Sequence, residues 1–460
     1  MWSPTLPAGT APVYERLVAA LAGDIAAGVL SPGDRLPPHR DLAFRLGVGV
    51  GTVTRAYAEA ERRGLLAGHV GRGSFVAAAR ADGARALDGS IDFARSLPPL
   101  APARQHMAAA MGRLARRPEL ADRLGYAPPG GFEADLTAGA DWLRRIHDWP
   151  DLTSGRLISC SGAQQAVAVA LGVVCRPGDA VIAEAATFAG LKSLAAHMNY
   201  RLIPATLDAE GLTPEALDRA VADSGARVAY VLPTQNPTAR VMGQARRRQI
   251  VEVARRRDLI LVEDDLYGAY AGGLGLAAKT PLAALAPERV LFVSALSKSI
   301  APGLRVGWLA LPDSGDWRGR ALGVLHAIAL GAPTLGGLIA AGWIEDGTAE
   351  AILMANRCEL EARTALSLEI LGPAAERPAM PGSPHLWLPM DELEAERVAG
   401  RAMRNGVELT PPDGPILDRA AMAGLRLCLG GAPDLVTLER GLRTVKAALS
   451  PAAAANRTLI

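Results

Sequence analysis

Short apolar runs alternate with segments of helical periodicity between residues 180 and 310. This alternation constrains the fold more than any other feature of the chain, because it is typical of a mostly parallel sheet in an α/β domain. The strands that it predicts are Ala180–Ala183, Arg227–Leu232, Leu259–Glu263 and Arg289–Val293.

Residues 1–76 follow a different order of elements. The sequence predicts three helices and then two short strands around a glycine-rich hairpin at 68–73. The helices are Val13–Ala27, Arg40–Leu46 and Thr52–Arg63, and the strands are Leu65–Leu66 and Ser74–Val76. This order is that of a winged helix-turn-helix.

Composition separates the remaining parts of the chain. Residues 77–90 (AAARADGARALDGS) have no apolar periodicity beyond alanine, which indicates a linker. The α/β domain then occupies residues 91–450, and we expect residues 451–460 to be a loose tail. The last third of the domain is more helical and ends in a strand at Leu425–Leu429 and a helix at Leu435–Leu449.

Composition also excludes several classes of protein. Half of the 460 residues are hydrophobic, so the chain can bury a large core, and its net charge of +2 excludes a generally polybasic coat. The four cysteines lack paired metal spacing, so we expect no metal site and reduced cytosolic thiols. The uncharged stretch 321–344 is long enough to span a bilayer. Its glycines and Pro333 instead favour a broken pair of buried helices in a soluble protein.

The run PGDRLPPHRDLAFRLGVGVGTVTRAYAEAERRGLLAGHVGRGSFV resembles the winged-helix DNA-binding domain of GntR-type regulators. The resemblance makes Thr52–Arg63 the recognition helix, with Val53, Ala56, Ala60 and in part Tyr57 facing inward. It predicts phosphate or minor-groove contacts from Arg35, Arg40 and Arg72, and further DNA contacts from Thr52, Thr54, Arg55 and His69. Relatives usually carry Ser-Arg-Asn/Thr where this chain has Gly49-Val50-Gly51, so one polar contact with a base or phosphate is missing.

Only four lysines occur in the chain, which narrows the search for a lysine that forms a Schiff base with a cofactor. Lys298 lies in SALSKSIAPGLRVGW, directly after the predicted strand Arg289–Val293. Here residues 91–450 resemble the fold-type I aminotransferases, which bind pyridoxal 5′-phosphate. The resemblance makes Lys298 the lysine that binds the cofactor and Arg305 the arginine that binds its phosphate, a role that suits a bidentate guanidinium.

The same resemblance assigns cofactor contacts at the ends of other strands. Asp264 would pair with the pyridine nitrogen, and Tyr267 and Asn236 would hydrogen-bond the phenolic oxygen. Asp265 is the competing carboxylate, and the spacing to Tyr267 favours Asp264. A helix that opens after the predicted strand Leu157–Cys160 would seat the phosphate on its backbone N–H groups. The residues of that seat are Ser161, Gly162, Ala163 and Gln164.

Three further residues complete the expected site. Phe188 would stack on the pyridine ring, although a core role is the alternative, and Arg426 would bind a substrate carboxylate. An arginine in an apolar strand needs a ligand or an acidic partner of this kind. Tyr126 would reach the phosphate from the partner subunit, which implies a homodimer. The sequence departs from the family at Ala295, where relatives carry a hydroxyl residue, and at Ala239, where glycine is usual.

A GntR-type winged helix joined to an aminotransferase-like domain resembles the MocR subfamily of bacterial transcriptional regulators. The resemblance implies a cytoplasmic homodimer, nucleoid-associated when bound to operator DNA, with no membrane contact and with winged helices exchanged between subunits. A small amino-compound effector would displace Lys298 as an external aldimine and pair with Arg426. Alternatively, the sensed ligand is pyridoxal phosphate itself. Two different functions also fit the sequence: an active aminotransferase with a DNA-binding appendage, and a structural DNA-bridging dimer.

Overall fold

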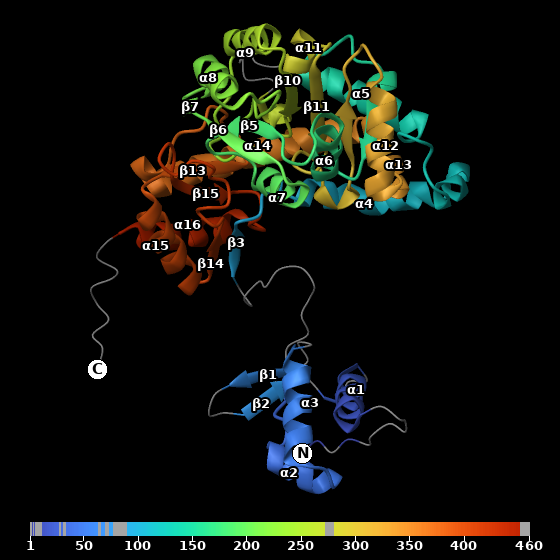
Figure 1. The fold of residues 1–460 in the computed structure, drawn as a ribbon, viewed down its shortest axis with the longest axis vertical. Coiled ribbons are helices and arrows are strands. Elements are labelled where there is room, and N and C mark those ends of the chain that lie inside the picture. The colour runs from blue at the N-terminus through green and yellow to red at the C-terminus, as the bar shows by residue number, and fades with distance from the viewer. Residues whose placement is uncertain are drawn as a thin grey trace. The chain divides into compact units, whose positions relative to one another are not determined.

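The computed structural model describes residues 2, 4, 12–26, 29–30, 34–62, 66–69, 73–76, 90–271 and 280–450. The chain divides into two compact units, residues 1–88 and 89–460 (Figure 1). Apart from Ser90, the predicted linker 77–90 lies outside the described residues, and so does the predicted tail 451–460.

The first unit consists of three helices and a two-stranded sheet. Its elements are α1 (Val13–Ala26), α2 (His39–Leu46), α3 (Val50–Arg62), β1 (Leu66–His69) and β2 (Gly73–Val76). Gly47, with a φ of 64°, ends α2 in the left-handed region that glycine adopts at least cost. β1 and β2 pair antiparallel, so the order of elements confirms a winged helix-turn-helix. α3 begins two residues earlier than the sequence predicted.

A small apolar core holds this unit together. The buried side chains that form it include Leu17, Val18, Leu21, Leu36, Leu42, Val53, Ala56, Tyr57, Ala60, Leu66 and Val76. Val53, Ala56 and Ala60 face inward as predicted. Tyr57 is more buried than predicted, at 2% exposed, because its hydroxyl finds a partner inside the unit by donating to the carbonyl of Pro37.

The second unit is built on a seven-stranded sheet. Its strands in spatial order are β4 (Leu157–Cys160), β12 (Gly307–Ala310), β11 (Val290–Ala295), β10 (Ile260–Asp264), β9 (Val228–Val231), β5 (Ala180–Glu184) and β6 (Arg201–Ala205). Only β12 runs antiparallel to its neighbours, β11 and β4, and the other pairs are parallel. The predicted mostly parallel sheet is therefore confirmed.

Helices cover both faces of this sheet. One face packs against α6 (Ala163–Val174), α7 (Ala189–Met198) and α12 (Trp317–Ala329). The other packs against α5 (Glu133–His147), α8 (Pro214–Ser224), α9 (Gln244–Arg256), α11 (Leu282–Leu285) and α13 (Thr334–Glu345). Successive residues of a strand point to opposite faces, so Leu291 and Phe292 of β11 belong to different apolar cores. Burial on both faces explains why these strands are continuous apolar runs in the sequence.

A C-terminal lobe completes the second unit (Figure 1). It contains β13 (His385–Pro389), α15 (Glu392–Arg404), β14 (Val407–Leu409), β15 (Gly424–Cys428) and α16 (Leu435–Leu449). The first strand of the unit, β3 (Ile91–Phe93), joins this lobe by pairing in parallel with β14. The remaining regular elements are α4 (Ala101–Leu114), η1 (Pro118–Leu124), η2 (Ser154–Arg156), β7 (Leu207–Asp208), β8 (Gly211–Leu212), α10 (Gly268–Ala271), η3 (Pro302–Leu304), α14 (Thr348–Leu371) and η4 (Gly372–Ala374).

The uncharged stretch 321–344 forms most of α12 and α13, which are separated by a break at 330–333. The predicted break is confirmed, but the helices are only partly buried, since Ile328, Leu330 and Leu335 are 45–50% exposed. Among the described residues no helix combines the length and the apolar character needed to cross a membrane.

Candidate functional site

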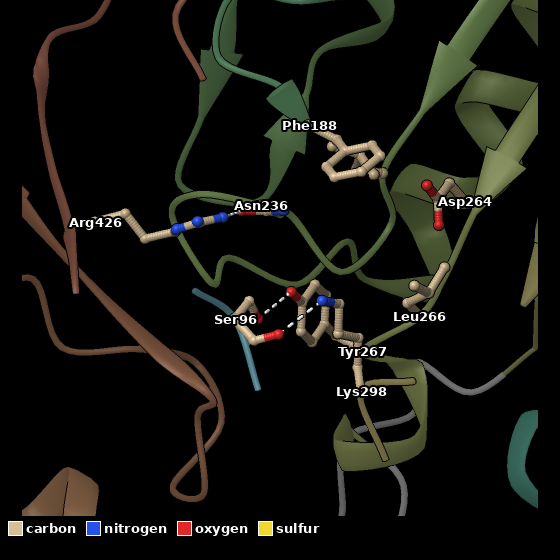
Figure 2. Close-up of a pocket in the computed structure, with 9 residues that line it drawn as sticks. Ser96, Phe188, Asn236, Asp264, Leu266, Tyr267, Lys298 and Arg426 are labelled. Carbon is tan, nitrogen blue, oxygen red and sulfur yellow. Dashed lines mark hydrogen bonds between the residues drawn. The ribbon is translucent and has the colours of Figure 1, made fainter. Parts of the chain in front are cut away.

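A cavity of about 170 Å³ opens beyond the carboxyl ends of β5, β9, β10 and β11 (Figure 2). This edge of a parallel sheet is where α/β proteins commonly bind ligands. Nine residues line the cavity: Ser96, Phe188, Leu232, Asn236, Asp264, Leu266, Tyr267, Lys298 and Arg426. The fold thus gathers six of the residues that the sequence singled out, from segments spread over more than half of the chain.

Lys298 follows β11 and extends into the cavity, where its Nζ donates to the carbonyl of Ser96 at 2.7 Å (Figure 2). Burial lowers the pKa of Lys298 to about 8, and the nearby guanidinium groups of Arg426 and Arg305 act in the same direction. Asp264 opposes them. An amine with a lowered pKa is more often neutral near pH 7, which is the form that attacks a carbonyl.

Asp264 ends β10 and lines the cavity, where its carboxylate accepts a hydrogen bond from the hydroxyl of Tyr230 in β9. Burial raises the pKa of Asp264 to about 7, and the Tyr230 hydrogen bond opposes this rise. The adjacent Asp265 lies elsewhere, with Oδ2 3.8 Å from Nδ1 of His147 and 4.0 Å from Nη2 of Arg247. Of the two candidate carboxylates, only Asp264 faces the cavity.

Arg426 enters the cavity from β15 in the C-terminal lobe. Its Nη1 donates to Oδ1 of Asn236 at 2.8 Å, and its Nη2 donates to the carbonyl of Ala94 and to Oγ1 of Thr410 at 3.0 and 3.1 Å. Within the described residues no carboxylate forms an ion pair with Arg426. Of the two partners expected from the sequence, a ligand or an acidic residue, the second is absent among these residues, and neutral oxygens accept the hydrogen bonds of Arg426.

Arg305 reaches the turn between β4 and α6. Its Nη2 donates to the carbonyl of Ser161 at 2.5 Å, and a Cβ added to Gly162 would lie only 2.8 Å from the same nitrogen. Gly162 also has a φ of +82°, so both its backbone conformation and this close approach require glycine. α6 begins at Ala163 without a side-chain cap. The first N–H groups of the helix and a guanidinium therefore lie together, as an anion seat requires.

Phe188 lines the cavity at the start of α7 and is held there by close packing. A Cβ on Gly190 would clash with the ring of Phe188 and with Oε1 of Gln164. Nε2 of Gln164 donates to the carbonyl of Gly190 at 3.0 Å. The side chain of Gln164 therefore binds the first turn of α7 rather than the phosphate seat.

Tyr126 is not brought to this cavity within its own chain. Its side chain is 85% exposed and borders a separate groove of about 580 Å³, which it lines with Leu322, His326 and Leu330 among others.

In the first unit, Arg35, Arg40, Thr54 and Arg55 are exposed and Thr52 is half-buried. Arg72 and the side chain of His69 lie outside what the structure describes.

Sequence reasoning missed four residues around the cavity. Leu232 and Leu266 are ordinary apolar wall residues, and nothing in the local sequence marks Ser96, whose Oγ is 2.7 Å from the hydroxyl of Tyr267. Tyr230 did carry a signal. A tyrosine within an apolar strand needs a partner for its hydroxyl, and the nearest strand end supplies Asp264.

The two units match two different family models. Residues 91–375 match the family described as aminotransferase class I and II, and residues 13–76 match the gntR family of bacterial regulatory proteins. Two curated relatives are uncharacterized HTH-type transcriptional regulators of Bacillus subtilis (strain 168). YdeF is 29% identical over 320 residues, which cover 68% of this chain and 67% of YdeF. YisV is 27% identical over 493 residues, which cover 96% of each chain.

Solved structures resemble the second unit. An archaeal alanine:glyoxylate aminotransferase superposes with a TM-score of 0.69 at 22% identity, covering 79% of this chain and 95% of that one. The kynurenine aminotransferase of Pyrococcus horikoshii gives a TM-score of 0.67 at 24% identity, covering 78% and 91%. At these identities the likeness establishes the fold alone.

Proposed function

The chain belongs to the aminotransferase class I and II family and carries a gntR-family winged helix, and we propose that it is a pyridoxal-phosphate-dependent transcriptional regulator. In this proposal the second unit senses an amino compound and changes the affinity of the first unit for operator DNA. The observation that carries the proposal is the convergence of Lys298, Asp264 and Arg426 on one cavity from three sides (Figure 2).

The residues around the cavity fit pyridoxal 5′-phosphate. Arg305 and the uncapped first turn of α6 suit a phosphate dianion. Asp264 is a buried carboxylate held by one tyrosine hydroxyl, and a protonated pyridine nitrogen would supply the positive partner that such a group needs. The cofactor supplies an aldehyde that reacts with primary amines and a ring that withdraws electrons. Lys298 would hold it, with Phe188 against the ring and Asn236 and Tyr267 at its phenolic oxygen.

Arg426 indicates what kind of effector the cavity would take. Its guanidinium is satisfied by neutral oxygens, so a ligand carboxylate would gain a charge-assisted hydrogen bond there. We therefore propose an effector with both an amino group and a carboxylate. Its binding would replace the link between Arg426 and Asn236, which joins the C-terminal lobe to the loop after β9. A ligand that changes such a link stabilises one of two conformations, with a typical coupling of about 1–3 kcal/mol. Pyridoxal phosphate itself is the alternative effector.

We further propose that the regulator is a homodimer. The exposed Tyr126, at 85%, would contribute to the cavity of the other subunit, and the two winged helices would be exchanged between subunits. Arg35 and Arg40 are exposed on the first unit and would contact DNA phosphates. A protein that binds operator DNA would work in the cytoplasm and would be nucleoid-associated when bound, which is the localisation that we propose.

The test combines absorption spectra with DNA-binding assays on the full chain. The purified protein should show a visible cofactor band that borohydride removes, and peptide mapping should find the label on Lys298. Lys298→Ala should lose the band, whereas Lys446→Ala, an exposed lysine on α16, should keep it. Candidate amino acids should then change the affinity for DNA. Sustained transamination at around ~10 turnovers per second, with no effect of any amine on DNA affinity, would identify an aminotransferase instead.

A further inference from the structure

The first turn of α3 carries an exposed apolar side chain where a recognition helix meets DNA. In helix-turn-helix proteins the N-terminal residues of the second helix of the motif contact base edges in the major groove. In this chain the segment is Gly49–Val50–Gly51, and Val50 is 45% exposed.

The fold of the unit does not require the glycine at 51. A Cβ at Gly51 would have no atom within 4 Å, and a Cβ at Gly49 would meet only Oγ1 of Thr52 at 3.9 Å. Neither glycine has a positive φ, in contrast to Gly47 at 64°. Glycine within a helix lowers stability relative to alanine because it has more backbone freedom to lose. The described residues of the unit therefore give no reason for a glycine at 51. A close approach by a molecule outside the unit is the remaining explanation that we consider.

Two polar side chains further along α3, those of Thr54 and Arg55, are engaged within the unit. The hydroxyl of Thr54 donates to the carbonyl of Val50 at 3.0 Å and lies 3.1 Å from Nδ1 of His39. The guanidinium of Arg55 stacks on Tyr14 of α1, with Cζ 4.1 Å from the ring centroid. These two side chains, which the sequence marked as DNA contacts, are held by the protein itself, whereas the methyl groups of Val50 are accessible.

We propose that Gly49 and Gly51 let the backbone of α3 approach the floor of the major groove closely, so that Val50 contacts the 5-methyl group of thymine. The inference rests on the proposed DNA-binding function and specifies how that function would select its sequence. Thymine presents a methyl group in the major groove beside the polar edges of the bases. The exposed side chain of Val50 is apolar like this methyl group, and the glycines on either side of it leave room for the two to come into contact.

The methyl contact can be tested on DNA that the full-length protein selects from a random pool. Deoxyuridine then replaces each selected thymidine in turn, which removes the methyl group and keeps every hydrogen-bonding edge. At one or two positions per half-site the affinity should fall by about four-fold, the effect of burying one methyl group. In Val50→Ala, which removes the two methyl groups that would contact thymine, the same replacement should have a smaller effect at those positions.

The close approach has its own test, in which stability and DNA binding change in opposite directions. Gly51→Ala should raise the melting temperature of the first unit and lower DNA affinity by about ten-fold, as overpacking at a tight interface does. Gly23→Ala is the matched control, because Gly23 is exposed in α1 and a Cβ there also meets nothing within 4 Å. It should stabilise the unit and leave DNA affinity unchanged.

The outcomes separate this inference from the function on which it rests. If the protein binds its selected DNA tightly but no thymidine can be distinguished from deoxyuridine, or if Gly51→Ala keeps full affinity, the inference is wrong and the proposed function stands. If wild-type protein binds no DNA at all, both fail.

Discussion

Glu184 at the end of β5 offers a test of buried charge that does not depend on any ligand. Its side chain is fully buried, Oε1 accepts from the backbone N–H of Leu232 at 2.9 Å, and Oε2 has no hydrogen-bond partner among the described groups. Burial raises the pKa of Glu184 from its ordinary 4.5 to about 8. Glu184→Gln keeps the shape of the side chain and the acceptor for the N–H of Leu232, but it cannot ionise. The variant should therefore keep its free energy of unfolding at high pH, where ionisation of Glu184 in the unfolded state lowers that of the wild type.

The magnitude follows from the two pKa values. A carboxyl group whose pKa is raised by folding contributes stability that is fully present below the unfolded pKa of 4.5 and is lost as the pH rises through the folded value of about 8. One pKa unit corresponds to about 1.4 kcal/mol. Glu184→Gln should therefore gain stability relative to wild type by about 4 kcal/mol between pH 5 and pH 9.

The assay is urea unfolding of both proteins at equal concentration, from pH 5 to pH 9. Tryptophan fluorescence reports on the second unit, because six of the seven tryptophans lie in residues 89–460. Glu252→Gln is the control, since Glu252 is exposed on α9, and its difference from wild type should stay within about 0.5 kcal/mol at every pH. Parallel curves for Glu184→Gln and wild type across this range would refute the reasoning.

Three further substitutions test the cavity and the DNA surface. Tyr230→Phe removes a hydrogen bond that lowers the pKa of Asp264, so that pKa should rise further. Cofactor affinity should then fall, because the carboxylate that would pair with the pyridine nitrogen is less often ionised, and a spectrophotometric titration with pyridoxal phosphate would measure it. Unchanged affinity would contradict this role. Arg426→Ala should abolish the DNA-binding response to carboxylated amines while DNA affinity without effector stays intact, as gel shifts can establish. Arg40→Ala should weaken binding to all DNA sequences and reduce the slope of log affinity against log salt by about one unit, whereas an unchanged slope would exclude a phosphate contact.

Strands that are buried on both faces were predictable from the sequence, and so was the mostly parallel direction of the sheet, but the reversal of β12 was not. β4 has the predicted bounds Leu157–Cys160, and β5 extends the predicted Ala180–Ala183 by one residue. A continuous apolar run between glycine and proline signals favours a buried strand. Its alternation with helices favours parallel neighbours, but neither pattern marks a single strand that runs the other way. The reversed direction of β12 depends on pairing with β4 and β11, more than 100 residues away in one case, and no local pattern encodes it.

Residues that line the cavity were predictable from the sequence where the residue type is rare in the chain or lies in a long motif. Lys298 is one of four lysines and lies in a long motif, so its position after β11 followed from the sequence. Ser96 could not be found in this way. It reaches the cavity because β3 pairs with β14 from the opposite end of the unit, which is a property of the tertiary fold. The start of α3 was predicted two residues late, at Thr52, because Gly47-Val48-Gly49 indicates a turn and Gly51 lowers helix propensity.

The pairing of β3 with β14 also has consequences for the synthesis of the chain and for truncated forms of it. The carbonyl of Ala94 accepts from Arg426 across 332 residues, so the cavity cannot close until almost the whole chain has left the ribosome. At about 5–20 residues per second, translation from the end of the first unit to β15 takes on the order of tens of seconds. A premature stop codon before Arg426 leaves the sequence of the winged-helix segment 13–76 intact and removes the arginine that we propose as the ligand of the effector carboxylate. Such truncated alleles should therefore encode chains that cannot respond to the effector, even where the winged-helix segment still folds.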